Sequence, residues 1–422
     1  MKRYVVSLIW LSSEKLYRLI LGLTVTALVV RYLGAELFGE LSYSYGCILI
    51  AASFGGLGVE SVFVRELINK EIDRPVLIAS VLFIKTIGVV FSAIIVLIFY
   101  VTTDSQLTKG LILIISLTQL YLPFAVLDNI FQSKVKARSI ALPNLLAFSV
   151  SSLVKILLVE VDASVYTFAL MYVIESTIIA GLLALMFLKE NEKINPRCVD
   201  FSVVKKLLKR CWPIFLSVVF ATISLKVDQI IIHHFLDSRS VGLYAASIKL
   251  AEVFYFIPVV ITVTIFPKLV ESSSGSSYQN TLVGISSLLT WLALGICVVL
   301  IPFRVPVIEL IFGADFILSG DLLLYHLLAL FSIFQYSLRK KALIVEGKEN
   351  FVLYYSIGTA VLLLSSLVAL IAMVGIRGAA IGHLVGWAAS LTLLPVILQR
   401  PGDLRLLIAS TNPINILRLI AR

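Results

Sequence analysis

Runs of about 20 apolar residues, the length that a membrane-spanning helix needs, recur along the whole 422-residue chain. Inside a bilayer every backbone polar group must be bonded within the protein, which helices of this length achieve. With 59% hydrophobic and only 14% charged residues, the chain is too apolar for a soluble globular protein. The sequence therefore predicts an all-α integral membrane protein.

Clusters of charged and turn residues mark the ends of twelve predicted spans. These cover residues 8–30, 41–63, 76–101, 110–131, 141–160, 164–188, 213–235, 242–266, 281–301, 320–338, 351–373 and 377–398. The longest hydrophilic stretch separates six spans from six. We therefore expect an N-terminal lobe over 1–190, a cytoplasmic linker over 191–210 that contains an amphipathic surface helix at 201–210, and a C-terminal lobe over 211–398. The tail 399–422 is too short and broken to span, and it suits a helix at the cytoplasmic interface.

Basic residues are distributed unequally between the two ends of these spans. Most loop lysines and arginines share a side with both termini, whereas the opposite side holds only Arg31, Lys109, Arg239, Arg304 and Arg377. Because lysine and arginine collect in cytoplasmic loops, both termini are predicted to be cytoplasmic. The same asymmetry accounts for most of the net charge of +10, so we expect membrane lipids and not nucleic acid as its partners.

The two halves contain a weak internal repeat. The segment YLGAELFGELSYS (32–44) aligns without gaps with FLDSRSVGLYAAS (235–247), and each joins the first span of its half to the second. Leu33 matches Leu236 and Gly39 matches Gly242. With six spans in each half the repeats share one orientation, which predicts two pseudo-symmetric lobes around a central cavity, as in transporters.

Four stretches of the sequence resemble a known family. They are RYLGAELFGELSYSYG (31–46), ASFGGLGVESVFVREL (52–67), the segment 212–269 and GIRGAAIG (375–382). These resemble the polysaccharide exporter family, specifically Wzx-type O-antigen flippases of the multidrug/oligosaccharidyl-lipid/polysaccharide (MOP) superfamily. The resemblance implies a bacterial inner-membrane protein that moves an undecaprenyl diphosphate-linked oligosaccharide, such as the O-antigen unit of lipopolysaccharide, to the outer leaflet by alternating access. No cofactor is expected. Contacts with a polysaccharide polymerase and chain-length proteins are left open.

Charged residues occur within the apolar spans themselves. A charge near the middle of a bilayer costs roughly 2.5–3.5 kcal/mol on insertion scales, so each needs a partner, water or a function. The basic ones are Lys15, Arg18, Lys85, Lys155, Lys226 and Lys249. The acidic ones, within spans or at their edges, are Glu14, Glu60, Asp128, Glu175, Asp228 and Glu252.

Cations in spans suit a cargo that carries phosphates in a bulky polar head, because such a head needs a wet cavity lined by positive charge. Arg18 offers a planar fork for two phosphate oxygens, whereas lysines act as point charges. We expect Arg18, Lys15 and Lys226 to face the central cavity, since they lie on the equivalent first helices of the two halves. Lys249 and Lys85 complete the predicted binding set.

Structural interpretations of the same charges stay open. Glu14 and Arg18 are four residues apart and Lys249 and Glu252 are three apart, so each pair can bond along one helix face.

Lys15 and Lys155 lie near predicted span ends and can extend to the interface. Lys226 and Asp228, two residues apart, point to different faces of their helix, which favours a functional role for both.

The source of energy for transport is a separate question. No GxxxxGK[ST] phosphate loop occurs, so we do not expect ATP hydrolysis. A membrane carboxylate can change protonation as its surroundings alternate between wet and dry, which would couple transport to H⁺ or Na⁺. The candidates for ion coupling or charge pairing are Glu14, Glu175, Asp228 and Glu252. The four histidines are interpreted as packing or interfacial residues.

Two alternatives compete with a flippase. An ion-coupled exporter of small molecules could use the same fold, for which a less cationic cavity is expected. A membrane enzyme of polysaccharide synthesis usually has a large outer loop or a catalytic segment. Here the predicted outer loops at 102–109, 161–163 and 236–241 are only a few residues long. We therefore do not expect an enzyme. The sugar, the coupling ion and the oligomeric state are left open.

Overall fold

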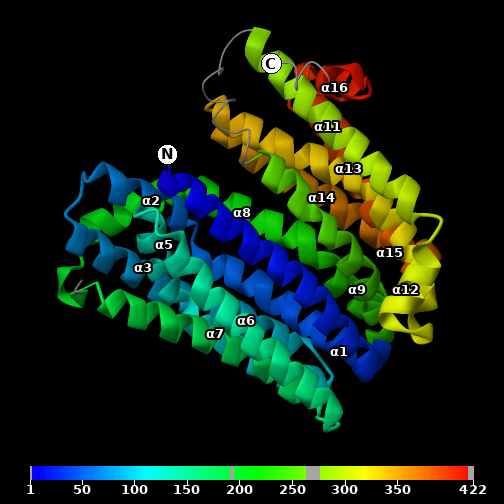
Figure 1. Cartoon of the computed structure of the whole chain (residues 1–422), viewed down its shortest axis with the longest axis horizontal. Coiled ribbons are helices and arrows are strands. Elements are labelled where there is room, and N and C mark those ends of the chain that lie inside the picture. Colours follow the sequence, from blue (N-terminus) through cyan, green and yellow to red (C-terminus); the bar gives the residue numbers. More distant parts are fainter. Residues whose placement is uncertain (1, 191–193, 263–275, 417–422) are drawn as a thin grey trace. The chain divides into compact units, whose positions relative to one another are not determined.

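The computed structural model describes residues 2–190, 194–262 and 276–416, and these form helices joined by short connections (Figure 1). This confirms the predicted all-α membrane fold. Eleven helical segments are long and apolar enough to cross a membrane in the described part of the chain. The chain divides into two compact units, Met1–Thr222 (unit 1) and Ile223–Arg422 (unit 2), and the division lies inside one long helix, α8.

The eleven segments account for all twelve predicted spans, because the first segment, Ser13–Asn69, is 57 residues long and holds 41–63 together with most of 8–30. Gly34 breaks the helix between these two spans with φ 70° and ψ 176°. Glycine adopts this left-handed φ without the strain that a Cβ would cause. The last residues of the predicted span 242–266 lie outside the described residues.

Unit 1 is built from the first half of the chain. Its elements are α1 (Lys2–Gly56), α2 (Val59–Asn69), α3 (Arg74–Thr102), α4 (Gln106–Ser116), η1 (Leu117–Phe124), α5 (Ala125–Ser133), α6 (Ala137–Glu160), α7 (Val165–Leu188), η2 (Pro196–Cys198) and the first part of α8 (Phe201–Phe235). Figure 1 shows α6 and α7 alongside α1, and α1 also packs on α3 and α4. The residues 201–210, predicted as a surface helix, are the start of α8.

An apolar core in unit 1 joins α2, α3 and α5 with the start of α8, and it includes Phe63, Leu77, Phe131 and Leu207. Arg210 of α8 also bonds to the buried carboxylate of Glu66 on α2. The start of α8 is therefore fixed to unit 1 by both apolar and ionic contacts.

Unit 2 contains the second half of the chain. Its elements are the rest of α8, α9 (Ser238–Glu252), η3 (Val253–Tyr255), α11 (Ser276–Leu300), α12 (Arg304–Phe312), η4 (Ala314–Phe316), α13 (Ile317–Val345), α14 (Glu349–Val374), α15 (Ile376–Ile397) and α16 (Pro401–Ser410). Helix α13 packs against α9, α11, α12 and α15, and α14 packs on α15. The connection between the predicted spans 281–301 and 320–338 is itself largely helical, because α12 continues the apolar pattern.

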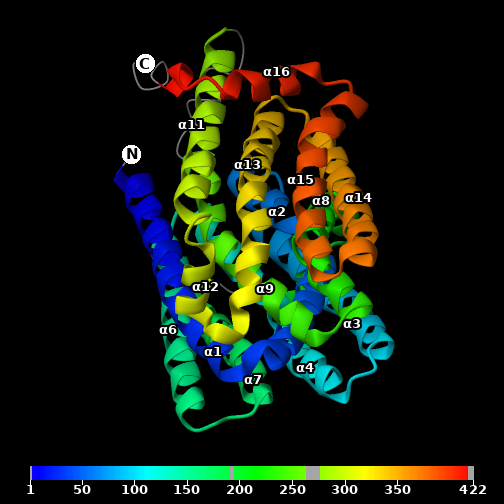
Figure 2. The same ribbon diagram turned by 90° about the vertical axis from the view of Figure 1, so that its right-hand side faces the viewer.

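Helix α16 lies across the ends of the long helices of unit 2 (Figure 2) and packs on α11 and α15. Asp403 accepts a hydrogen bond from Tyr355 at 2.6 Å and lies 3.5 Å from the Arg339 guanidinium, which is only 4% exposed. Arg400 donates to Glu346 at 2.8 Å. Burial opposes ionisation of Glu346, but its hydrogen bonds with Arg400 and Lys348 outweigh this effect and hold the pKa of the carboxyl below its ordinary value. The last tail residues, 417–422, lie outside the described residues.

Candidate functional site

Arg18 of α1 bonds to a carboxylate on another helix as well as to one on its own. Its Nη2 donates to Glu175 Oε1 of α7 at 3.1 Å, and its Nη1 lies 3.5 Å from Glu14 Oε1. The guanidinium also lies 4.9 Å from the centre of the Phe148 ring of α6. One cation between two carboxylates leaves an excess of one negative charge among these three side chains. Lys15, which follows Glu14 on α1, is exposed. The interpretation as a pair along one helix is therefore incomplete, because Glu175 also takes part.

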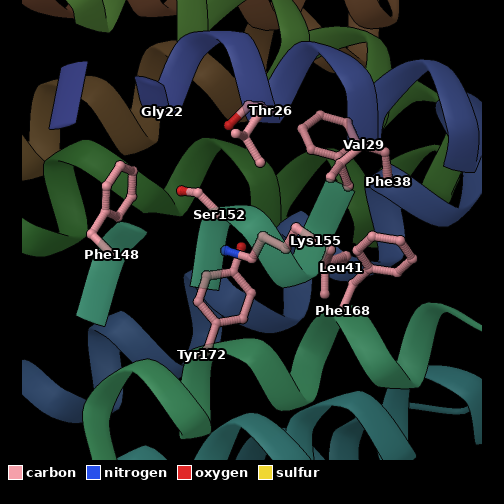
Figure 3. Close-up of a pocket in the computed structure, with 11 residues that line it drawn as sticks. Gly22, Thr26, Val29, Phe38, Leu41, Phe148, Ser152, Lys155, Phe168 and Tyr172 are labelled. Carbon is pink, nitrogen blue, oxygen red and sulfur yellow. The ribbon is translucent and has the colours of Figure 1, made fainter. Parts of the chain in front are cut away.

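A pocket of about 70 Å³ is lined by residues of α1, α6 and α7 in unit 1 (Figure 3). Gly22 and Thr26 line it from α1, four and eight residues after Arg18, so they share its helix face. Phe148 forms part of the wall and also contacts Arg18. Arg18 therefore lies close to this pocket, on the far side of its wall residue Phe148.

Lys155 of α6 lines the same pocket, with its ammonium 5.0 Å from the centre of the Tyr172 ring. In Figure 3 its side chain lies between Ser152 and Tyr172. The sequence identifies Lys155 as a charge within a span that can extend to the interface, but it does not include Lys155 in the predicted binding set. The spacing of Phe148, Ser152 and Lys155, which repeats every three to four residues, is the signal that places them on one face.

Lys85 of α3, a member of the predicted binding set, is held within unit 1. Only 1% of the residue is exposed, and its Nζ donates to Gly56 O at 3.0 Å and to Glu60 Oε1 at 2.5 Å. Close helix packing brings these groups together, since a Cβ on Gly88 would lie 2.1 Å from Gly55 O. The ammonium is thus already bonded to a carbonyl and a carboxylate, and its role as a cargo ligand stays a prediction.

Lys226 and Lys249 share one carboxylate in unit 2. Lys226 of α8 donates to Glu252 Oε1 of α9 at 2.9 Å, and Lys249 Nζ lies 3.6 Å from Glu252 Oε2. Two ammonium groups on one carboxylate leave an excess of one positive charge among these three side chains. Lys249 is the more exposed, with 47% of its side chain accessible against 16% for Lys226. Residue spacing along α8 could not predict the contact of Lys226 with Glu252 on α9.

Asp228 of α8 is buried in unit 2 and contacts a different group of side chains. Its Oδ2 accepts a hydrogen bond from the Tyr244 hydroxyl at 2.7 Å and lies 3.6 Å from His383 Nδ1. Its Oδ1 accepts from the backbone N–H of Gln229 at 2.8 Å. The predicted residues Lys226 and Asp228 therefore do point to different partners, although only two residues separate them.

Comparison with known proteins places the chain in a family. The sequence model of the family described as "polysaccharide biosynthesis protein" matches residues 5–273, which is well over half of the chain. The chain belongs to this family. A search of the curated proteins finds no match.

Solved structures share its fold over almost the whole length. The lipid II flippase MurJ, in an inward closed conformation, is 17% identical, with a TM-score of 0.70 over 94% of this chain and 90% of MurJ. An inward-facing multidrug resistance MATE family transporter of the MOP superfamily is 13% identical, with a TM-score of 0.62 over 95% of this chain and 98% of its own. A Vibrio cholerae MATE transporter is 15% identical, with a TM-score of 0.61 over 98% and 100%. At these identities the likeness establishes a MOP-type fold.

Proposed function

We propose that this protein moves an undecaprenyl diphosphate-linked oligosaccharide, an O-antigen or similar repeat unit, from the cytoplasmic to the outer leaflet of the bacterial inner membrane. Membership of the polysaccharide biosynthesis family supports a role in making surface polysaccharide. The fold shared with a lipid II flippase supports transport of a lipid-linked cargo and not an enzymatic step. Alternating access is the mechanism that such a fold suggests.

The observation that carries the proposal is the excess positive charge formed by Lys226, Lys249 and Glu252 on two membrane helices. A diphosphate head would gain charge-assisted hydrogen bonds there, and Lys249 is exposed enough to reach it. In unit 1, Lys155 in the pocket and Arg18 beside its wall residue Phe148 offer further cations. A phosphate at Arg18 would compete with Glu14 and Glu175 for the guanidinium, so we assign the stronger anion contact to Lys226 and Lys249.

A second candidate is an ion-coupled exporter of small molecules. The MATE transporters that share the fold favour this function. The two lysines that share Glu252 argue against it for the many small drugs that are cations themselves, since like charges repel inside the membrane.

Depletion of the protein in its native host separates the two candidates. Mass spectrometry would measure the amount of diphosphate-linked oligosaccharide lipid, and access of an impermeant reagent would report its leaflet. Complete units that accumulate in the cytoplasmic leaflet would support the flippase. Unchanged amounts with normal surface polysaccharide would contradict it and favour the small-molecule exporter.

Charge reversal then tests the assigned contact. Lys226→Glu should reproduce the accumulation caused by depletion, because it replaces the excess positive charge by a negative one. Lys206→Glu is the matched control, since Lys206 is an exposed residue of the same helix outside the proposed site. Normal export by a well-folded Lys226→Glu variant would remove Lys226 from the site.

A further inference from the structure

Four buried polar side chains from four helices meet inside unit 2. They are Asp228 of α8, Tyr244 of α9, His326 of α13 and His383 of α15, and each is at most 1% exposed. We refer to them as the histidine cluster. Neither the lysine pair on Glu252 nor the pocket of unit 1 includes any of them. A polar group at this depth is expensive unless it is bonded or has a function.

The cluster is a continuous chain of contacts. The Tyr244 hydroxyl lies 2.7 Å from Asp228 Oδ2 and 3.3 Å from His383 Nδ1. The His383 Nδ1 is itself 3.6 Å from the same carboxylate oxygen. The ring centre of His326 is 4.8 Å from that of Tyr244 and 4.9 Å from that of His383. Asp228, Tyr244 and His383 are therefore joined by polar contacts, and the His326 ring packs against two of them.

The cluster has unused capacity to bind protons. In the described part of the chain, both ring nitrogens of His326 and the Nε2 of His383 are buried without a hydrogen-bond partner. If the two histidines served packing alone, three buried nitrogen atoms would be left unbonded, each of which costs free energy. Such exceptions call for a functional explanation.

The other ionisable groups around the cluster are already engaged or neutral. Glu252 interacts electrostatically with Tyr244, but it is already engaged by both Lys226 and Lys249. Tyr255 interacts electrostatically with both Glu252 and Asp228. Asp228 itself has its ion-pair contact with His383, which carries a charge only when it is protonated.

We propose that Asp228 and His383 together bind a single proton, and that this proton is the coupling ion of the transporter. The coupling role rests on the proposed transport function. The step is a simple addition, in which one proton from the aqueous phase joins the carboxylate and imidazole pair. It gives either a carboxylate beside an imidazolium or a carboxylic acid beside a neutral imidazole, and in both forms the proton belongs to the pair.

The donor set favours a proton over Na⁺. Hard cations take several oxygen ligands, whereas this cluster offers two imidazoles and a single carboxylate. Both oxygens of that carboxylate already accept hydrogen bonds. Among the described residues, no group of three or more histidine, cysteine, aspartate or glutamate side chains is arranged to hold a metal ion.

Proton binding would change contacts between helices. The Tyr244 hydroxyl and the Nδ1 of His383 both approach Asp228 Oδ2, so an N–H on Nδ1 competes with the hydroxyl for that oxygen. These three groups lie on α9, α15 and α8. A proton that strengthens one contact at the expense of the other therefore biases how α9 and α15 pack on α8, which is what coupling requires.

Selective ¹⁵N labelling of histidine makes the site directly measurable, because the chain contains only four histidines. The full-length protein in lipid nanodiscs would be titrated between about pH 5 and pH 9, the range in which histidine responds. We expect a titrating signal that is lost in His383→Gln and also in Asp228→Asn. The control His234→Gln, which changes an exposed histidine of α8, should retain that signal. A His383 signal that stays constant with pH, or that titrates unchanged in Asp228→Asn, would overturn the proton site.

Proteoliposomes test the coupling itself. The probe is the diphosphate-linked oligosaccharide lipid extracted from depleted cells, and its leaflet is followed with and without an imposed gradient of about one pH unit, which is worth up to about tenfold in an equilibrium. We expect the gradient to shift the distribution for the wild type and for His234→Gln, and not for His383→Gln. Flipping that ignores the gradient would overturn coupling while the proposed function stands. Absence of flipping would count against the proposed function and, with it, the coupling role, while the histidine titration would still decide whether the proton site exists.

Discussion

Lys85 shows how this chain accommodates a charge within an apolar helix. Its ammonium is buried and bonds to the carbonyl of Gly56 and the carboxylate of Glu60, whereas 46% of the Glu60 side chain is exposed. The two partners therefore differ in how well they tolerate separation. An exposed carboxylate can be solvated when its partner is removed, but a buried ammonium cannot.

We predict that Glu60→Gln lowers the free energy of unfolding by about 3 kcal/mol, because it leaves the Lys85 charge buried without its carboxylate. Lys85→Met should cost less than about 1 kcal/mol, since it fills a similar volume and releases Glu60 to solvent. Reversible denaturation in lipid or mild detergent would measure both. Glu309→Gln, at an exposed carboxylate of α12, is the control and should change little. A larger loss for Lys85→Met than for Glu60→Gln would contradict this asymmetry.

Glycines determine how closely two helices of unit 2 approach each other. Gly378, Gly382 and Gly386 recur every four residues on α15 and face α14. A Cβ on Gly378 would lie 1.9 Å from Leu370 O, and one on Gly382 would lie 2.9 Å from the Cα of Leu367. Small residues at this spacing allow backbones to pack directly in membranes. His383 follows Gly382, so the same packing positions a member of the histidine cluster.

Gly378→Ala should destabilise unit 2 by about 1–3 kcal/mol, because the added methyl group forces the two backbones apart. Gly295→Ala on α11 is the matched control, since a Cβ at this position would have no heavy atom of another residue within 4 Å beyond its own stretch of helix. There the better helix propensity of alanine should be neutral or add up to about 1 kcal/mol. Thermal unfolding of the purified variants would compare them. Equal stability of both variants would show that α14 and α15 are not in direct backbone contact.

The elements also show what sequence can and cannot specify. Span positions follow from local apolar length, which is why all twelve predicted spans lie within the described helical segments or run just beyond them. The kink at Gly34 depends on a backbone angle that glycine permits but does not require. The site residues pair across helices, as with Lys226 and Glu252, which are 26 residues apart.

The histidine cluster is even harder to predict from sequence patterns than the ion pairs between helices. Tyr244 and His383, which are in contact, are separated by 139 residues. Isolated histidines in apolar helices have no local pattern that distinguishes a packing role from a shared proton site. That distinction needs the helix packing of unit 2 as a whole.

The orientation of the chain in the membrane is a property of the whole molecule, because it depends on the charge of all loops together. Helix α3 is 29 residues long, or about 43 Å at 1.5 Å per residue, so it crosses the bilayer and separates its two flanking loops. Basic residues accumulate at the end with Lys70 and Arg74, which predicts that this end is cytoplasmic. The end near Asp104 should then face outward.

Cysteine labelling tests this orientation with two exposed acidic residues, Glu71 and Asp104, at opposite ends of α3. The four native cysteines are first replaced, and Glu71→Cys and Asp104→Cys are then made separately. An impermeant maleimide added to spheroplasts should label Asp104→Cys at once and Glu71→Cys only after the membrane is opened. The reverse pattern would mean that the whole chain has the opposite orientation, with the lysines predicted as cytoplasmic lying outside. It would also contradict the direction of cargo movement proposed for this protein. Labelling of both sites before opening would instead show that α3 does not separate the two compartments.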